Sequence, residues 1–407
     1  MDRTQLRRFP YPYKALVAIC SDVDGTPDRD HYLNIARFLN TEDETPAGKG
    51  VGLEVGNTIY FDMPDSQFAY WNTDDVGRQI VRKLIRSGHI DCFHSFGDLA
   101  TTREHARRAL QELEEHGCRI ECWVDHAVAP TNFGADIMRG TGDVPDMPAY
   151  HADLTHRHGV RFVWTGRVTS VIGQDRRHSI NHLHSLRNPV ATARTSAKEL
   201  AKGYLGRTGN EKFAMHGAND LARPTHLRDG HEVYEFMRCN PHWGGVSAGD
   251  TADGFGDVLT ETFLRRLIDR RGSCILYTHL GKTSEPGTIF RRKTIEGLHL
   301  LAEAVDGREI LVTTTRRMLG FWLATRSIVV TKSQHQHGDI VNIDTRPLRE
   351  LDMPCDLDGI SIYVRNSDTT RIFVDGAEIV EVQRNPEDET GQQSISIPWA
   401  PLGFPEL

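Results

Sequence analysis

Acidic and histidine side chains stand directly after four apolar runs in this sequence of 407 residues. The four groups are Asp22 and Asp24 after residues 14–20, His94 and Asp98 after 90–93, Asp125 and His126 after 119–124, and His279 after 274–277. Carboxylates and imidazoles bind divalent cations, and they also move protons near neutral pH. One such group alone is weak evidence, but their repetition at like positions predicts the site of a metal-dependent hydrolase.

The spacing within two of these groups supports a cation site. Asp22 and Asp24 are two residues apart at the end of a strand-like run, so both carboxylates point to the same side. Like charges this close repel each other unless a cation lies between them or one carboxylate takes a proton. His94 and Asp98 are four residues apart, and one helical turn would bring them to a common ion.

The elements that must position these groups alternate along the chain. Short apolar runs of strand type are followed by amphipathic stretches of helix type, for example 74–85, 103–116 and 255–271. This alternation predicts parallel strands joined by right-handed crossovers. About seven such units fit a (β/α) barrel better than an open sheet, and a barrel carries its reactive groups where the strands end.

Three segments depart from this alternation. Residues 50–62 are expected to form a β-hairpin with Gly56-Asn57 at the turn. Residues 170–254 are rich in Gly, Asn, His and Arg, and we expect insertion loops on the active-site face there. Short alternating strands after residue 326 predict a separate domain, a small antiparallel β-sandwich over 327–407, beside a barrel domain over 1–326.

Composition limits the partners. The 48 basic and 56 acidic residues give a net charge of −8, which argues against binding to nucleic acid. No apolar run approaches the roughly twenty residues of a membrane span, and the N-terminus does not resemble an export signal, so we expect a cytoplasmic protein. The seven cysteines are scattered, mostly in strand-like runs, and are expected to be reduced and structural.

The motifs resemble those of the polysaccharide deacetylases, the NodB-homology group of carbohydrate esterases, over about residues 14–325. Ser21-Asp22-Val23-Asp24-Gly25 is similar to the acidic first motif of that family, and His94-Ser95-Phe96-Gly97-Asp98 keeps half of the second. The strand end that carries His279 looks like the last motif. The resemblance implies a deformed (β/α)7 TIM-like barrel that holds one divalent metal ion, zinc or another first-row divalent.

The resemblance also implies roles for single residues. Asp22 would be the general base, His279 the general acid, and Asp24, His94 and Asp98 the metal ligands. Asp98 stands where the family has a histidine, so two arrangements remain open: Asp98 is the third ligand, or His126 is the ligand and Asp98 its partner. The family's arginine motif is missing, and Arg167 or Arg238 could take its place.

The sequence therefore predicts a hydrolase that removes an acyl group, N-acetyl in type, from a sugar or glycan precursor. Asp125, Arg167, Arg238 and Trp243 are the candidate substrate contacts, Trp243 by stacking on a sugar ring. Two alternatives are a hydrolase of a non-sugar amide or glycosidic bond on the same barrel, and an inactive carbohydrate-binding homologue. The oligomeric state stays open.

Overall fold

The computed structural model describes residues 6–180, 188–285, 287–335, 338–353 and 356–407. The chain packs as two compact units by its internal contacts. The larger unit is residues 17–316 with 402–407, and the smaller unit is residues 1–16 with 317–401. The last six residues thus return to the larger unit, where the Lys83 ammonium donates to the carbonyl of Glu406 at 2.7 Å.

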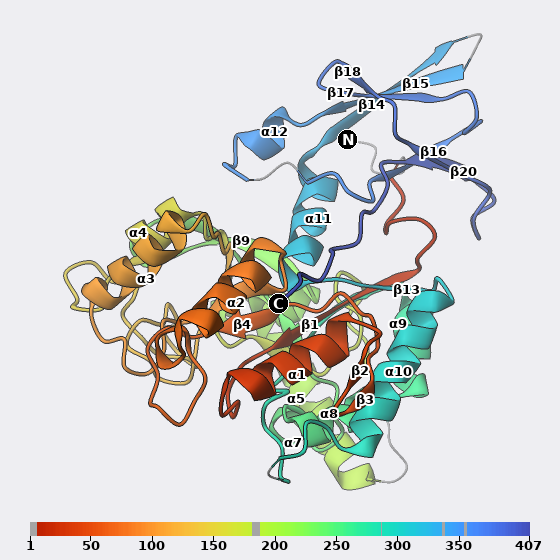
Figure 1. Cartoon of the computed structure of the whole chain (residues 1–407). Helices are drawn as coiled ribbons and strands as arrows, with labels where there is room; N and C mark the ends of the chain where they lie inside the picture. Colours follow the sequence, from red (N-terminus) through yellow and green to blue (C-terminus); the bar gives the residue numbers. More distant parts are fainter. Residues whose placement is uncertain (1–5, 181–187, 286, 336–337, 354–355) are drawn as a thin grey trace. The chain divides into compact units, whose positions relative to one another are not determined.

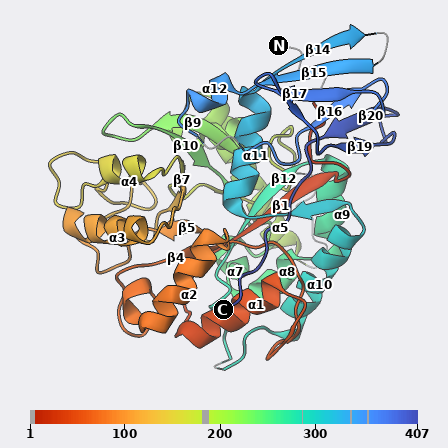
Figure 2. The same ribbon diagram turned by 45° about the horizontal axis from the view of Figure 1, so that its top comes forward.

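The larger unit is a mixed α/β fold around a curled, half-barrel sheet (Figures 1 and 2). Its strands, among the described residues, are β1 Ala15–Ser21, β4 Asn57–Ile59, β5 Ile90–His94, β6 Cys122–Val124, β7 Phe162–Trp164, β8 Val168–Thr169, β9 Ala222–His226, β10 Glu232–Phe236, β11 Arg238–Cys239, β12 Ser273–Thr278 and β13 Ile310–Val312. They are ordered β8-β11-β12-β1-β4-β5-β6-β7-β10-β9, with β13 paired to β1. A small hairpin, β2 Glu44–Thr45 with β3 Gly48–Lys49, lies apart from this sheet.

Helices follow the strands along the chain. They are α1 Arg29–Asn40, α2 Asp75–Arg86, α3 Arg103–Glu115, α4 Ala152–His158, α5 Pro189–Arg207, α6 Ala214–Ala218, α7 Val246–Gly249, α8 Ala252–Val258, α9 Glu261–Arg270, α10 Arg292–Asp306 and α11 Thr315–Ser327, with 3-10 turns at Tyr70–Asn72 and Glu211–Phe213. Side-chain caps fix where several of them begin. Asp28, Asp74 and Thr260 each accept a backbone N–H three residues later, which satisfies a donor that the helix itself leaves unpaired.

Parallel pairing places the strand ends that carry the acidic and histidine groups at one edge of the sheet. Strand β4 pairs parallel with β1 and β5, and β6 pairs parallel with β5 and β7. On the other side of β1, β12 pairs parallel with β11. Since parallel strands end together, the segments after β1, β5, β6 and β12 emerge side by side.

The hairpin prediction for residues 50–62 is wrong. Residues 57–59 form β4, which is a central strand between β1 and β5 and not one arm of a hairpin. Gly56 serves close packing, because a Cβ there would lie 2.5 Å from Oδ1 of Asp91 on the neighbouring strand. The glycine therefore marks a tight contact between strands, and not a turn.

Residues 170–254 are more than the insertion loops expected from their composition. They contribute β9, β10 and β11, and β10 pairs parallel with β7 at one side of the curled sheet. Strand β11 lies between β8 and β12. A segment without strong apolar periodicity therefore still completes the sheet.

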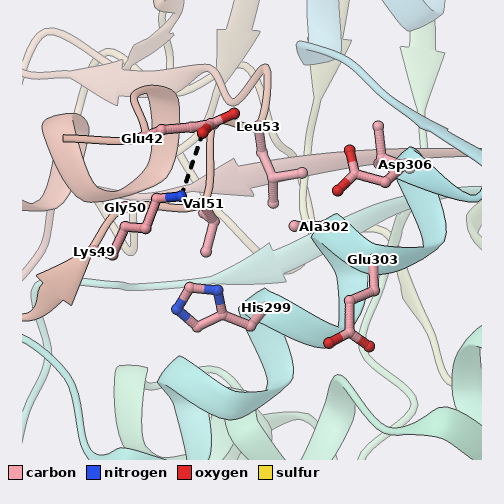
Figure 3. Close-up of a pocket in the computed structure, with 11 residues that line it drawn as sticks. Glu42, Lys49, Gly50, Val51, Leu53, His299, Ala302, Glu303 and Asp306 are labelled. Atoms are coloured by element: carbon pink, nitrogen blue, oxygen red, sulfur yellow. Dashed lines mark ion pairs between the residues drawn. The ribbon is translucent and has the colours of Figure 1, made fainter.

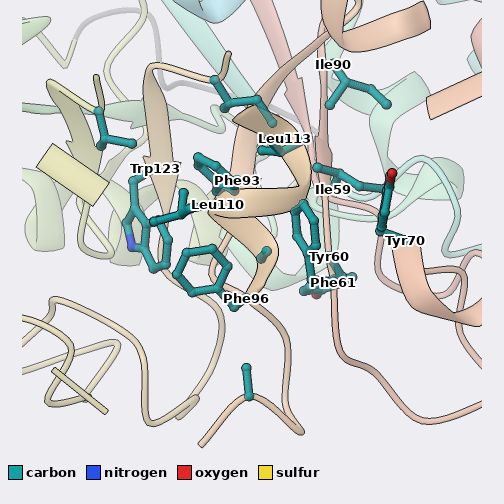
Figure 4. Packing of buried hydrophobic residues seen from close by; sticks show 14 of the residues in the cluster. Ile59, Tyr60, Phe61, Tyr70, Ile90, Phe93, Phe96, Leu110, Leu113 and Trp123 are labelled. Atoms are coloured by element: carbon teal, nitrogen blue, oxygen red, sulfur yellow. The ribbon is translucent and has the colours of Figure 1, made fainter. Parts of the chain in front are cut away.

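A cluster of buried aromatic and aliphatic side chains forms a core of the larger unit, part of which is drawn in Figure 4. Phe93 lies 5.8 Å from Trp123 between ring centroids, and Phe96 lies 5.1 Å from Trp123. Leu110 and Leu113 of α3 pack into the same cluster. Burial of this much apolar surface holds the strands that carry the acidic and histidine groups.

Histidine 151 is a neutral part of this core, and we expect it to make stability depend on pH. Its Nε2 donates to the carbonyl of Thr131 at 2.8 Å, and burial lowers its pKa from 6.5 to about 4. Its contribution to stability is therefore complete above pH 6.5 and is lost as the pH falls toward 4. His151→Gln should flatten the pH dependence of the free energy of unfolding over this range by about 1.4 kcal/mol per pH unit.

Denaturant unfolding between pH 4 and 7 measures that slope. The matched control is His226→Gln, because His226 is exposed. An unchanged slope in His151→Gln would show that His151 is not the group that titrates.

The smaller unit contains two small sheets. One has strands β14 Val329–His335, β15 Gly338–Asp344, β17 Arg371–Val374 and β18 Ala377–Ile379, and the other has β16 Ser361–Val364, β19 Gln383–Asn385 and β20 Gln393–Ser396. A short helix, α12 Arg346–Arg349, follows β15. Strands β15 and β17 are parallel, so the prediction of a purely antiparallel domain is wrong for this pair.

The six cysteines among the described residues are free and buried, and the seventh, Cys355, lies outside those residues. Among the described helices, none has the length and apolar character that a bilayer span requires.

Candidate metal centre

Two overlapping groups of acidic and histidine side chains meet at the carboxyl edge of the sheet, and either group could hold a metal ion. One group is Asp24, His94 and His126, and the other is Asp22, Asp24 and His279. Within each group the donor atoms all lie within 4.8 Å of one another. The structure thus brings together five side chains that the sequence singled out, from four separate strand ends.

Asp24 is common to both groups. Its Oδ1 lies 3.0 Å from Nε2 of His126, and its Oδ2 lies 3.1 Å from Nε2 of His94. Burial would raise the pKa of Asp24, but the hydrogen bonds from these two histidines lower it far below 3.8. Asp24 is therefore a buried, ionised carboxylate that favours positive charge beside it.

His126 lies between two carboxylates. Its Nδ1 is 3.0 Å from Oδ1 of Asp98, whose side chain is 43% exposed, while its Nε2 faces Asp24. Burial would lower the pKa of His126, but Asp24 and Asp98 outweigh it and raise the pKa to about 9. Of the two arrangements left open by the sequence, the geometry places His126 among the converging donors and Asp98 behind it.

His94 is oriented in the same way. Its Nε2 faces Asp24, and its Nδ1 lies 3.7 Å from Oδ1 of Asp22. Burial lowers the pKa of His94, which favours the neutral ring that a metal ion requires. Both imidazoles therefore present Nε2 to one point, with a carboxylate on the far side of each ring.

Of the two arginines considered in the sequence, Arg238 pairs with Asp22 and Arg167 does not. The Arg238 guanidinium donates to both carboxylate oxygens of Asp22, at 2.9 and 3.0 Å. Arg238 is fully buried, with Trp164 3.6 Å and Tyr277 4.2 Å from its Cζ to the ring centroids. Burial alone would raise the pKa of Asp22, but the charges of Arg238, His94 and His279, with the hydrogen bonds from Arg238, together outweigh it, so the pKa is lowered.

His279 completes the second group. Its Nδ1 donates to the carbonyl of Asp250 at 2.7 Å, which leaves Nε2 facing Asp24 at 3.6 Å and Asp22 at 3.8 Å. The backbone N–H of His279 also donates to that carbonyl, at 2.7 Å. The ring is thus fixed by Asp250 in one orientation, toward both carboxylates.

Tyr60 and Asp250 belong to the site and were missed in the sequence. The Tyr60 hydroxyl donates to Oδ2 of Asp24 at 2.9 Å, and its ring packs against His94 and His126 at 4.7 and 5.0 Å. Burial raises the pKa of Tyr60, so the hydroxyl keeps its proton. Assigning β4 as a central strand would have revealed Tyr60, since it directly follows that strand.

Three of the predicted substrate contacts have other partners. Asp125 is fully buried and accepts N–H donors from Trp123, Phe133 and Gly134 at 2.7–2.8 Å, so it fixes the loop after β6 and cannot reach a substrate. Burial raises the pKa of Asp125 to about 7. Arg238 is also fully buried, and pairs with Asp22 as described above.

Arg167 and Trp243 are not among the converging side chains. Arg167 forms ion pairs with Asp136 at 3.0 Å and with Glu235 at 3.1 Å, and not with Asp22. Trp243 stacks on His242 at 5.0 Å between ring centroids and is 39% exposed, so one of its faces is open to a ligand.

A separate surface pocket of about 190 Å³ lies between residues 42–53 and α10 (Figure 3). Lys49 and Glu42 form an ion pair of 3.4 Å at its wall. None of the side chains of the candidate metal centre lines this pocket, so the two are independent.

Comparisons with protein-family models, with curated proteins and with solved structures each found no match.

Proposed function

We propose that this protein is a metal-dependent hydrolase that removes an acyl group, N-acetyl in type, from a sugar or glycan precursor. The observation that carries the proposal is the convergence of Asp24, His94 and His126 beside Asp22 and His279. A carboxylate with two imidazoles supplies ligands for an ion, and a second carboxylate and a third imidazole supply a base and an acid. We also propose that the curled sheet is a deformed (β/α)7 barrel and that the smaller unit is a β-sandwich.

The residues present fit a divalent ion of the first transition row, zinc or another. Two neutral imidazoles and a carboxylate are a common ligand set for such ions. Asp98 forms an ion pair with the far nitrogen of His126, and carboxylates are commonly found behind metal-binding histidines. Asp24 and Asp98 raise the pKa of His126 to about 9, so binding of an ion at this position displaces a proton from the ring.

Asp22 and His279 would move the protons. When bound, the ion supplies Lewis acidity toward the acyl oxygen and the attacking water. Asp22, kept ionised by Arg238, accepts the proton of that water. His279 presents Nε2, since Nδ1 is engaged by Asp250, and Nε2 gives a proton to the leaving amine.

Contacts with neighbouring groups already hold the side chains of the site in place. Tyr60 holds Asp24, Arg238 holds Asp22, and the Asp250 carbonyl holds His279. Such prior organisation of charged groups is a large part of enzymatic rate enhancement. The open face of Trp243 is our candidate for contact with the sugar ring.

The test uses the purified full chain. We expect close to one equivalent of a divalent metal by elemental analysis, and release of acetate from a panel of N-acetylated sugars. Treatment with a chelator should abolish the release, and adding back the metal should restore it. Release of reducing ends without acetate would instead show a glycosidase, and binding of sugars without turnover would show a carbohydrate-binding protein.

Variants of His126 and Asp98 should show which of the two side chains is the metal ligand and which is its ion-pair partner. His126→Ala removes a converging donor and is expected to abolish metal binding, whereas Asp98→Ala leaves the donors in place. We expect Asp98→Ala to weaken metal affinity by about 10- to 100-fold. Competition with a chromogenic chelator measures both, and the opposite ranking would make Asp98 the ligand.

A further inference from the structure

Helix α5 has polar side chains on its buried face and apolar side chains on its exposed face. Its buried residues are Thr192, Ser196, Glu199 and Gly203. Val190, Leu200 and Tyr204 are 79%, 52% and 68% exposed. A surface helix normally has the opposite arrangement. The exposed apolar face of α5 is therefore a candidate surface for binding a partner.

The polar inner face fixes the helix in this orientation. Glu199 accepts from the Thr169 hydroxyl at 2.9 Å and from the Lys202 ammonium at 2.9 Å. Lys202 also donates to the carbonyl of Val168 at 2.8 Å. These bonds fasten α5 to β8, and β8 pairs with β11, the strand that carries Arg238. The apolar face is therefore held outward, and the inner face is linked through β8 and β11 to Arg238, the partner of Asp22.

Other exposed apolar side chains stand in the segments that follow the strands of the site. Leu99 follows β5 next to Asp98, and Val128 follows β6 two residues after His126. Ile137 and Met147 lie on the same loop as Val128. Exposed apolar side chains thus occur in the segments that follow β5 and β6 as well as on α5.

Positive charge flanks the apolar face of α5. Arg194 and Lys198 are exposed, and Arg207 ends the helix. Within the described part of the chain, no carboxylate forms an ion pair with Arg194 or Lys198. The whole chain has a net charge of −8, so this cationic patch is local. Its partner must therefore combine apolar surface with negative charge.

We propose that the outer face of α5, together with the exposed apolar residues beside the site, docks on the surface of an anionic lipid membrane. Exposed apolar side chains flanked by basic ones are typical of helices that lie in a membrane interface. A second copy of this chain fits less well, because a twofold contact through α5 would bring Arg194 and Lys198 of both copies together. In combination with the proposed function, and resting on it, docking would present a lipid-linked sugar to the metal centre.

Sedimentation of the full chain with vesicles tests the docking without any need for activity. We expect binding to vesicles of phosphatidylglycerol and phosphatidylcholine, weakening at high salt, and little binding to phosphatidylcholine alone. Arg194→Gln with Lys198→Gln should weaken binding to the anionic vesicles about 30-fold, from about 5-fold per cation. Leu200→Asn with Tyr204→Asn should weaken it at least about tenfold, because apolar area then stays in water.

Matched controls come from exposed residues elsewhere. Val380→Asn in the smaller unit and Arg292→Gln on α10 should leave binding unchanged. Equal binding to both vesicle types, or binding that the α5 variants do not alter, would overturn the proposal. So would a dimer in light scattering that Leu200→Asn with Tyr204→Asn dissociates, since a second copy would then cover this face. Metal content and acetate release are measured separately, so failure of docking and failure of the proposed function remain distinguishable.

Discussion

Replacing Asp22 by Asn is expected to lower kcat/KM for acetate release by about 10²- to 10⁴-fold while the metal stays bound. The carboxylate is the proposed base, and a positioned acid or base contributes about 10²- to 10⁴-fold. Asp24, His94 and His126 are untouched by the change, so the converging donors remain. Steady-state kinetics and elemental analysis of the same preparation check both halves of the prediction.

The control for Asp22→Asn is Asp136→Asn. Asp136 is also a carboxylate paired with an arginine, Arg167, but it lies outside both donor groups. It should keep full activity. An active Asp22→Asn variant would exclude Asp22 as the base, and loss of its metal would instead make Asp22 a ligand.

Replacing Arg238 by Met is expected to lower both stability and activity. The guanidinium is fully buried and donates to both oxygens of Asp22, so its removal leaves a buried carboxylate without its countercharge. Breaking a buried ion pair from one side costs about 3–5 kcal/mol. The pKa of Asp22 should also rise, because burial raises it once the charge of Arg238 is gone.

Two measurements follow from this reasoning. Denaturant unfolding should give a lower free energy of unfolding, and the acid limb of the pH–rate profile should move to higher pH. The double variant Asp22→Asn with Arg238→Met removes both charges and should recover much of the stability without activity. If Arg238→Met moves neither stability nor the acid limb, Arg238 does not act through Asp22.

The carboxyl edge of the sheet was predictable because each strand there is a buried apolar run followed at once by its polar residues. The run 15–21 is entirely buried, and Asp22 and Asp24 follow it. At such places the sequence pattern alone predicts where the residues lie in the fold. The same holds for the start of α2, where Asp74 is the cap. The choice between Asp98 and His126 was not local, since it depends on how the loops after β5 and β6 fold against each other.

Other features could not be inferred from local pattern. Residues 57–59 form only a three-residue strand, and Gly56-Asn57 is also typical of a turn, so the central position of β4 and the role of Tyr60 were hidden. Arg238 lies on a two-residue strand inside a long polar segment. Its position beside Asp22 depends on the pairing of β11 with β12. The hydrophobic pattern around residue 238 does not predict that pairing.

The order of strands β12-β1-β4-β5-β6 also has a consequence for synthesis. The first strand of the sheet receives its neighbour β12 only after most of the larger unit has left the ribosome, and His279 comes with it. Contacts of such high sequence separation form late and slowly. A nascent chain therefore holds Asp22 and Asp24 before Arg238 and His279 are available, so the candidate metal centre cannot be assembled until most of the larger unit has been synthesised.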